Sequence, residues 1–283
     1  MFPRIIAAVA ALGALCAVAG PVAAESEARH ARDVRWSFEG PFGTFDQGQL
    51  QRGYRVYREV CASCHSMSLM SFRNLGQPGG PFHDAAFANP NENPYVRALA
   101  AEAQVADVDN ETGDAIQRPA TSADRFPPPY ANEAAARAGN GGALPPDLSV
   151  ITKARGGGAD YIYSLLVGYE RPPAGLTVAA GQYYNPYMLG DLSSAWRGDR
   201  HEIPEGGFIA MPPPLTAGQV TYDDGTRPTV DQMARDVTAY LAWASEPRQV
   251  QRKSMGLAVM IYLLIFAAIV YASYRQIWRN VAH

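Results

Sequence analysis

Residues 61–65 form the C-x-x-C-H motif Cys61-Ala62-Ser63-Cys64-His65, which constrains the fold of this chain more than any other feature. Two thiols at this spacing can each form a thioether with a haem vinyl group, and the histidine that follows them is then placed beneath the iron. We therefore predict one covalently attached haem c, with Cys61 and Cys64 as the attachment points and His65 as an axial iron ligand.

Two other chemistries use closely spaced cysteines, and the rest of the sequence argues against both. A thioredoxin-like redox pair lies near a βαβ pattern in a cytosolic protein, and neither feature is recognisable here. A zinc site needs four ligands, normally completed by a second Cys or His pair. The one further cysteine, Cys16, lies in an N-terminal segment that we expect to be removed.

The first 24 residues are typical of a secretory signal peptide. Arg4 supplies the positive start, residues 5–19 are apolar and rich in alanine, and Val22-Ala23-Ala24 provides small residues before an expected cut near Glu25. The apolar part is short for a membrane span, which favours cleavage over an uncleaved anchor. Export also suits the haem motif, because c-type haem is attached outside the cytoplasm.

A second apolar segment lies near the C-terminus, where the 21 residues between Lys253 and Arg275 carry no charge. This length suits a transmembrane helix, with aromatic residues expected at one interface. These aromatic residues are Tyr271, Tyr274 and Trp278. The sequence thus predicts three parts: a signal peptide (1–24), a periplasmic haem domain (25–247) and a membrane anchor with a short cytoplasmic tail (248–283), whose span covers about 254–274.

The predicted periplasmic domain is acidic. All 27 acidic residues but only 18 of the 24 basic residues lie in it, which gives a formal net charge of −9. This charge argues against nucleic acid as a partner and favours a basic protein. Acidic side chains gather between positions 102 and 114, where they either steer a basic cytochrome or form a solvated loop. They are Glu102, Asp107, Asp109, Glu111 and Asp114.

Helical periodicity marks three segments of the domain. The first is predicted to run from Asp46, which can cap it, to Met67. Gly53 within it costs about 1 kcal/mol relative to alanine, which is explained if another helix crosses closely there. The candidate crossing helix has a capping box at 229–232, an apolar face and a stop at Pro247. The third helix is predicted from Gly158 or Ala159 to Gly168.

Glycine and proline dominate the segments between these helices, and little of the remainder has a strand pattern. A loop-rich chain of this size needs an organising centre, which a buried haem provides. The fold class predicted is mainly α: a cytochrome c-like haem domain with long Gly/Pro-rich loops, plus one C-terminal transmembrane helix.

A haem used for electron transfer usually has a second protein ligand, and a methionine thioether raises the reduction potential. Met67 and Met70 are too close to His65 to reach the opposite face, and Met233 lies on the apolar face of the last helix of the domain. Met211 follows glycines and precedes prolines, in an extended loop suited to place a side chain against a flat ring. We favour Met211, and the alternatives are Met188, a histidine (His83 or His201) or an open site.

Several separate motifs, in the family's order, closely resemble cytochrome c1 of the cytochrome bc1 complex. They are LQRGYRVYREVCASCHSM at 50–67, GALPPDLS at 142–149, DYIYSLLVGY at 160–169 and YDDGT at 222–226. The resemblance extends from about Trp36 to the C-terminal anchor, and the simple export signal resembles that of a bacterial member.

The resemblance implies roles for individual residues. Met211 matches the family's axial methionine. Asn140, Arg155 and Tyr161 match positions that contact the haem propionates or rim, where such side chains can pair with or donate to a carboxylate. Pro145 matches a residue whose backbone carbonyl orients the axial histidine through its Nδ1–H. The glycines on either side of Asn140 depart from the bulkier or amide residues that relatives often carry.

The resemblance also implies a function. The chain would be the one-electron carrier of a ubiquinol–cytochrome c reductase, passing electrons from the Rieske iron–sulfur protein to a basic c-type cytochrome. It would be an electron-transfer subunit rather than an enzyme by itself, bound to cytochrome b in the inner membrane with its haem domain in the periplasm. A membrane-tethered cytochrome shuttle outside a bc1 complex is the alternative, whereas a peroxidase or a gas sensor would need an open or displaceable iron position.

Overall fold

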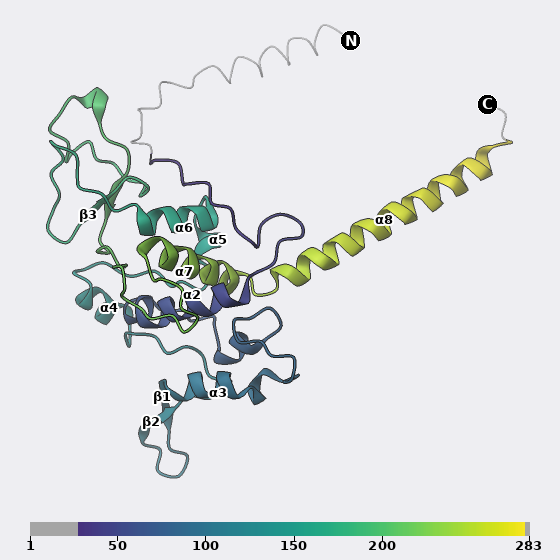
Figure 1. Ribbon diagram of the computed structural model, residues 1–283, viewed down its shortest axis with the longest axis horizontal. Coiled ribbons are helices and arrows are strands. Elements are labelled where there is room, and N and C mark those ends of the chain that lie inside the picture. The colour runs from purple at the N-terminus through teal and green to yellow at the C-terminus, as the bar shows by residue number, and fades with distance from the viewer. Residues whose placement is uncertain (1–27, 281–283) are drawn as a thin grey trace, which may run out of the picture.

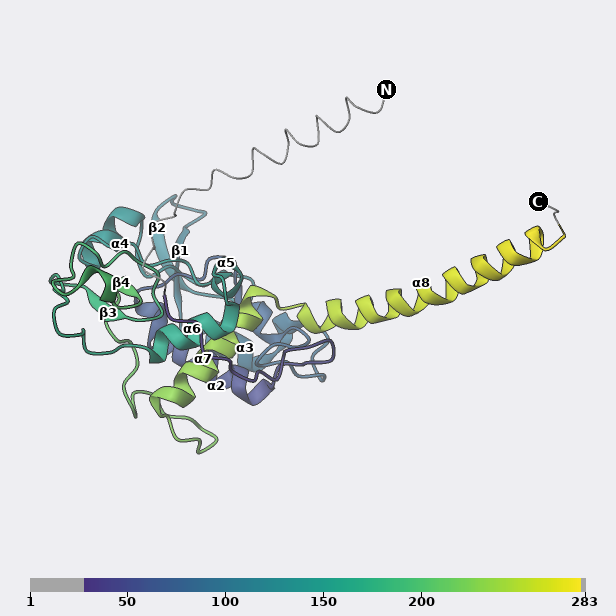
Figure 2. The ribbon, with the colours of Figure 1, turned by 90° about the horizontal axis from the view of Figure 1, so that it is seen from above.

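The structure is a computed structural model that describes residues 28–280, so the predicted signal peptide and Cys16 lie outside it. A helical domain carries one long helix that projects away from it (Figures 1 and 2), which confirms the predicted fold class. The α-helices are α2 (Gln47–Glu59), α3 (Pro94–Ala101), α4 (Glu133–Gly139), α5 (Ile151–Ala154), α6 (Gly158–Val167), α7 (Val230–Ser245) and α8 (Gln249–Trp278). Short 3-10 helices are η1 (Cys61–Ser63), η2 (Phe72–Gly76), η3 (Pro90–Glu92) and η4 (Arg200–Glu202).

The domain is organised around α2 and α7, which cross at its centre (Figure 1). The crossing is close because Gly53 has no side chain. A Cβ atom built on Gly53 would lie 2.0 Å from the carbonyl oxygen of Asp236 and 2.7 Å from the Cβ of Tyr240. The prediction that a second helix crosses at Gly53 is therefore confirmed.

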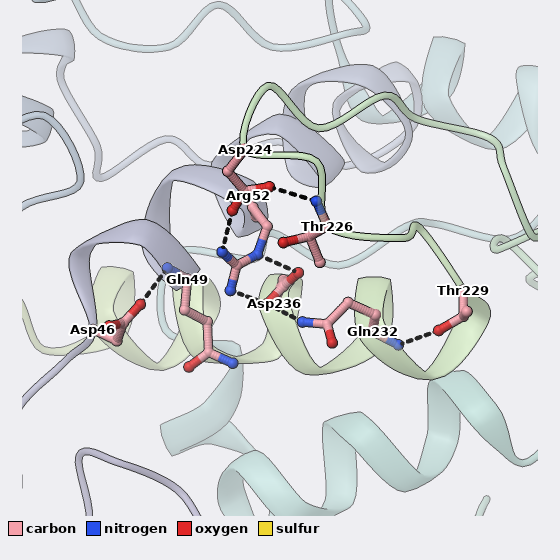
Figure 3. Close-up of polar contacts among 8 residues, drawn as sticks. All are labelled: Asp46, Gln49, Arg52, Asp224, Thr226, Thr229, Gln232 and Asp236. Carbon is pink, nitrogen blue, oxygen red and sulfur yellow. Dashed lines mark hydrogen bonds and ion pairs between the residues drawn. The ribbon is translucent and has the colours of Figure 1, made fainter.

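A buried ion pair joins the two helices beside this crossing (Figure 3). Arg52 donates from Nε to Asp236 at 3.0 Å and from Nη1 to Asp224 at 2.6 Å, so it also binds the loop that precedes α7. Gln232 donates to the same Asp236 carboxylate at 2.9 Å. The carboxylate is fully buried, and burial raises the pKa of Asp236 although the Arg52 guanidinium opposes this shift.

Both helices begin at the capping residues that the sequence predicts (Figure 3). Asp46 accepts from the backbone N–H of Gln49 at 2.6 Å, and Thr229 accepts from that of Gln232 at 3.1 Å. The predicted apolar face of α7 is buried in the main core of the domain, and α6 ends at Gly168 as expected. The buried residues of that face are Met233, Val237, Tyr240, Leu241 and Ala244.

The end of the first helix differs from the prediction. The α-helical part stops at Glu59. It is followed by the 3-10 turn η1, which begins at Cys61 and ends just before Cys64, so the helix does not continue to Met67. Ser63 explains the break, because its hydroxyl donates to the carbonyl of Val60 at 2.8 Å. That carbonyl would otherwise accept from Cys64, whose N–H bonds to Cys61 instead.

Two short antiparallel sheets complete the domain, and the sequence analysis predicted neither of them. Strand β1 (Gln104–Val108) pairs with β2 (Ala115–Pro119), from Gln104 opposite Pro119 to Val108 opposite Ala115. The acidic segment 102–114 thus contains strand β1 and the turn that follows it. Strand β3 (Tyr183–Asn185) pairs with β4 (Gly207–Ile209) near a second, smaller core of Leu176, Tyr184 and Leu192.

The long helix α8 follows α7 after only three residues. Glu246 lies in this connection and receives Lys153 of α5 at 2.9 Å as well as Arg252 of α8. Hydrogen bonds from Arg252 and pairing with Lys153 lower the pKa of Glu246 to about 2. Beyond Lys253 the helix is apolar enough to cross a membrane, with a mean hydropathy of 2.5, and within the described residues it packs against no other element.

Replacing Gly53 with alanine should separate α2 from α7. The new methyl group has no free space, and overpacking of this kind costs about 1–3 kcal/mol, so the midpoint of thermal unfolding followed by circular dichroism should fall. Gly48→Ala is the matched control in the same helix, because its Cβ would meet only ordinary contacts at 3.5 Å or more. An equal loss of stability in both variants would contradict the role assigned to the crossing.

Candidate functional site

Cys61 begins η1 and Cys64 directly follows it, just after the central helix α2. Both are free thiols, and both are partly exposed. Burial of the sulfur raises the pKa of Cys61 to about 12, with the nearby Cys64 adding to the effect. A thiol of this kind stays protonated at neutral pH and is a poor redox or metal thiolate.

The histidine of the motif is held by a single hydrogen bond to a neighbouring loop. Its Nδ1 lies 2.8 Å from the carbonyl oxygen of Pro146. Since a carbonyl can only accept, Nδ1 carries the proton and Nε2 keeps a free lone pair. Burial also lowers the pKa of His65, which favours the neutral ring. This is the state in which a histidine ligates iron.

The carbonyl that His65 contacts corrects the sequence prediction by one residue. We expected Pro145 to orient the ring, but the bond is formed by Pro146. Two consecutive prolines lock the backbone of this loop and offer two carbonyls to a nearby donor. Only the path of the loop decides which of the two faces His65, and sequence cannot give that path.

The loop that carries Pro146 is fastened to the motif by Asp147, a residue that the sequence analysis did not single out. Its carboxylate accepts from the hydroxyl of Ser66 at 2.9 Å, from the N–H of Ser68 at 2.8 Å and from the N–H of Ser149 at 2.8 Å. Although burial opposes the shift, hydrogen bonds from Ser149 and Ser68 hold the pKa of Asp147 well below its usual range. Asp147 thus positions the loop that positions His65.

Asn140 is engaged within its own segment. It caps the C-terminal end of α4, and its amide donates to Tyr130 at 3.1 Å and to the carbonyl of Ala136 at 2.7 Å. The neighbouring glycine is explained by the same tyrosine, because a Cβ on Gly139 would lie 2.9 Å from the Tyr130 ring. Both amide protons of Asn140 are therefore used inside the protein, which leaves its carbonyl oxygen as the group available to another partner.

Arg155 and Tyr161 lie on neighbouring turns. Arg155 follows α5 and is exposed, with one contact from Nη1 to the carbonyl of Ala154 at 3.2 Å. Tyr161 lies in α6, where burial raises the pKa of its hydroxyl and the charge of Arg155 opposes this. The Tyr161 hydroxyl donates to the sulfur of Met188 at 3.7 Å. The structure thus brings Arg155, Tyr161 and Met188 to one side of α6.

Met211 follows β4 by two residues and is half-buried. Its carbonyl accepts from the hydroxyl of Tyr169, just beyond α6, at 3.0 Å. The strand before it pairs with β3, but the chain bends at Ala210 and Met211, so the extended backbone expected around Met211 ends at Ile209. Close approach at Gly207, whose Cβ would lie 2.9 Å from the carbonyl oxygen of Met188, keeps the Met188 loop against β4.

The other candidate ligands are held elsewhere in the fold. Met67, Met70 and Met233 are buried core residues, and Met67 accepts from the hydroxyl of Tyr240 at 3.6 Å. The Nδ1 of His83 lies 3.3 Å from the carbonyl oxygen of Gly76, and His201 is exposed in η4. The core assignment of Met233 is confirmed.

The acidic hairpin is joined to the end of α2 that carries the haem motif. Glu102 pairs with Arg58, one turn before Cys61, at 2.5 Å. Asp107 pairs with Arg118 on the opposite strand at 2.5 Å. The three other acids lie in the turn, where Asp109 accepts from the N–H of Glu111 at 2.8 Å, and within residues 28–280 none has a basic partner. The tip of the hairpin therefore carries the uncompensated negative charge.

Comparison with known proteins gives a consistent result. A model of the Cytochrome C1 family matches residues 36–281. The chain is 40% identical to cytochrome c1 of Rhodospirillum rubrum over 98% of this chain and 97% of the relative. It is 42% identical to a mitochondrial cytochrome c1 heme protein of Arabidopsis thaliana over 90% of this chain and 75% of the relative. It is also 43% identical to cytochrome b/c1 of Bradyrhizobium diazoefficiens over 87% of this chain, but spans only 35% of that longer protein.

Replacing Asp147 with asparagine should loosen the loop that holds His65. Hydrogen bonds to a charged acceptor contribute about 1.5–3 kcal/mol, so the free energy of unfolding at pH 7 should fall by about 2 kcal/mol. Because the folded pKa is depressed, this contribution is complete above the unfolded pKa of about 3.9 and is lost as pH falls further. Denaturant unfolding at pH 7 and in acid measures it.

Asp191→Asn is the control for this experiment, because that carboxylate accepts only within its own turn, from Ser193 at 2.8 Å. It should cost less than about 0.5 kcal/mol. A difference between wild type and Asp147→Asn that stays constant below pH 4 would contradict the assignment.

Proposed function

The chain belongs to the cytochrome c1 family, the haem subunit of the bc1 complex in electron transport, and from this premise we propose how its own residues serve that function. Family membership implies a covalently bound c-type haem and an electron-transfer role within a larger complex. The observation that carries the residue assignment is the motif after α2, with two free thiols and a histidine whose Nδ1 is bound to a backbone carbonyl.

In this proposal Cys61 and Cys64 attach the haem, and His65 and Met211 are its axial ligands. When bound, the haem supplies a one-electron iron couple. The free lone pair on Nε2 of His65 supports its assignment, because Pro146 occupies the other ring nitrogen. The hydrogen bond from Tyr169 to the carbonyl of Met211 supports this assignment, because it holds the backbone that carries a half-buried side chain. Arg155 and Tyr161 are assigned to the haem propionates or rim, and Asn140, whose two amide protons are already used, is assigned to the rim.

The protein's contribution is to hold these groups still. Arg52 and Gly53 set the crossing of α2 and α7, and α2 delivers the motif. Asp147 fixes the loop that orients His65. The hydrogen bond that the His65 ring donates to this loop makes the histidine a stronger ligand. Ligands held in fixed positions would move little between the oxidised and the reduced state, which keeps the reorganisation energy of one-electron transfer low.

The partners follow from the complex. Cytochrome b and the Rieske iron–sulfur protein are the neighbouring subunits, and we assign a basic c-type cytochrome as the electron acceptor. The acidic tip of the β1–β2 hairpin supports that assignment, since complementary charge steers association. Helix α8 anchors the chain in the inner membrane as a single span, with the haem domain on the periplasmic side. Its uncharged 254–274 segment supports this arrangement, because at 1.5 Å per residue it covers about 30 Å.

Met211→Leu tests the ligand assignment. Loss of the thioether should abolish the methionine–iron charge-transfer band in the visible spectrum and lower the reduction potential by about 0.1 V or more, within the roughly 0.8 V range that axial ligands control. Met188→Leu is the matched control and should leave the spectrum unchanged. If the band is lost in Met188→Leu and kept in Met211→Leu, the two methionines exchange roles.

Neutralising the hairpin tip tests the acceptor site. The triple change Asp109→Asn, Glu111→Gln and Asp114→Asn should slow reduction of a basic cytochrome c at low salt, and should flatten the dependence of the rate on ionic strength. The controls are Asp33→Asn and Glu202→Gln, which remove exposed acids elsewhere. An unchanged salt dependence in the triple variant would remove the hairpin from the docking surface.

A further inference from the structure

An exposed phenylalanine lies in the loop beside the start of α8. Phe42 is 76% exposed, more than any other large apolar residue between Arg29 and Gln249, and it belongs to the Gly40-Pro41-Phe42-Gly43 turn before α2. In both Figure 1 and Figure 2 this loop lies next to the first turns of α8. The domain therefore presents an aromatic side chain at the point where its anchor begins.

The loop is tied to the anchor by the last charge before the apolar segment. Lys253 donates from Nζ to the carbonyl of Phe38 at 2.6 Å and to that of Gly43 at 3.5 Å. The next 21 residues of α8 carry no charge. A lysine at such a boundary extends its ammonium toward the polar side while its stem stays with the apolar segment. The carbonyls that it binds therefore mark the level of the membrane surface.

The rest of the loop is consistent with that level. Glu39 is the only charged residue between Phe38 and Phe45, and its carboxylate accepts from the backbone N–H of Trp36. The loop itself is well anchored, because the ring of Phe38 is buried and stacks on Phe45 with centroids 4.7 Å apart. Phe42 thus projects from an anchored loop and is not packed into the domain.

A second surface at the same end of the domain is formed by three prolines, two glutamines and one arginine. A cavity of about 260 Å³ lies between the start of α8 and two neighbouring loops. Arg248 is the charged residue of its lining, beside Gln251, Pro78 and Pro90. Basic side chains next to a span are attracted to anionic headgroups, and aromatic or aliphatic side chains insert at the acyl boundary. The two surfaces together have the character of an interfacial contact.

From these observations we infer that the Gly40–Gly43 loop contacts the lipid bilayer, with Phe42 inserted at the headgroup boundary as a second attachment point beside α8. The inference rests on the proposal that α8 spans the membrane. Its consequence is an anchor with two points of contact, which fixes the tilt of the haem domain on the membrane as well as its distance from it.

Spin labelling of the full chain in vesicles tests the inference. The haem occupies Cys61 and Cys64, and Cys16→Ala removes the third thiol. A nitroxide is then attached at Phe42→Cys, Leu189→Cys or Ala268→Cys. Leu189 is the matched control, because it is 68% exposed and lies in the chain between β3 and β4, which are at the end of the domain away from α8 in Figure 2. Ala268 is the reference within the span. The iron is kept in the ferrous state, because low-spin ferrous iron is diamagnetic and does not relax the nitroxide.

Power saturation is measured with oxygen, which concentrates in lipid, and with a nickel chelate, which stays in water. The vesicles contain phosphatidylcholine and phosphatidylglycerol. The ratio of oxygen to nickel accessibility at position 42 should be several-fold higher than at 189 and lower than at 268. Equal ratios at 42 and 189, with 268 in lipid, would overturn the inference and leave the span intact. A water-exposed label at 268 would overturn the span, and the inference with it. If the label at position 42 becomes inaccessible to both oxygen and the nickel chelate only in the assembled complex, the loop contacts a protein partner instead.

Discussion

The close crossing of α2 and α7 is the constraint on which the rest of the structure depends. At Gly53 the two backbones approach so closely that a single methyl group does not fit. The charges of Arg52 and Asp236 are taken out of water beside this contact, and a buried pair of this kind is strongly destabilising if one partner is removed. The fixed position of α2 determines where its last turn points, and hence where the cysteines and the histidine that follow it lie.

From that point the site is assembled by loops and not by helices. The Pro145–Asp147 segment reaches the motif across a long sequence separation, and three hydrogen bonds to one carboxylate hold it there. Hydrogen bonds form only at short range, so the loop must come close to its final position before any of the three can form. This dependence explains why prolines and glycines dominate the connections, since residues with a restricted or a special backbone angle reduce the number of wrong paths.

The sequence predicted those features that depend on local pattern. The caps at Asp46 and Thr229, the buried face of α7 and the crossing at Gly53 each follow from residue type and spacing. Features that depend on competition between side chain and backbone were not predicted. The helix ends before the cysteines because the Ser63 hydroxyl takes a backbone acceptor, and a helical period cannot reveal that. The acidic residues at 104–119 obscured the strand pattern of this hairpin. Gly113 was an available signal, because glycine is typical of such a turn, and here it has a φ of +78°.

The three-residue connection between α7 and α8 sets the freedom of the domain. Its only acidic group, Glu246, binds both Lys153 in the domain and Arg252 in the projecting helix. A flexible linker would let the domain sample a volume that grows with linker length, and would give each partner a local concentration averaged over that volume. A three-residue joint that carries two ion pairs narrows this volume, so the domain presents its surfaces to partners within a smaller range of orientations.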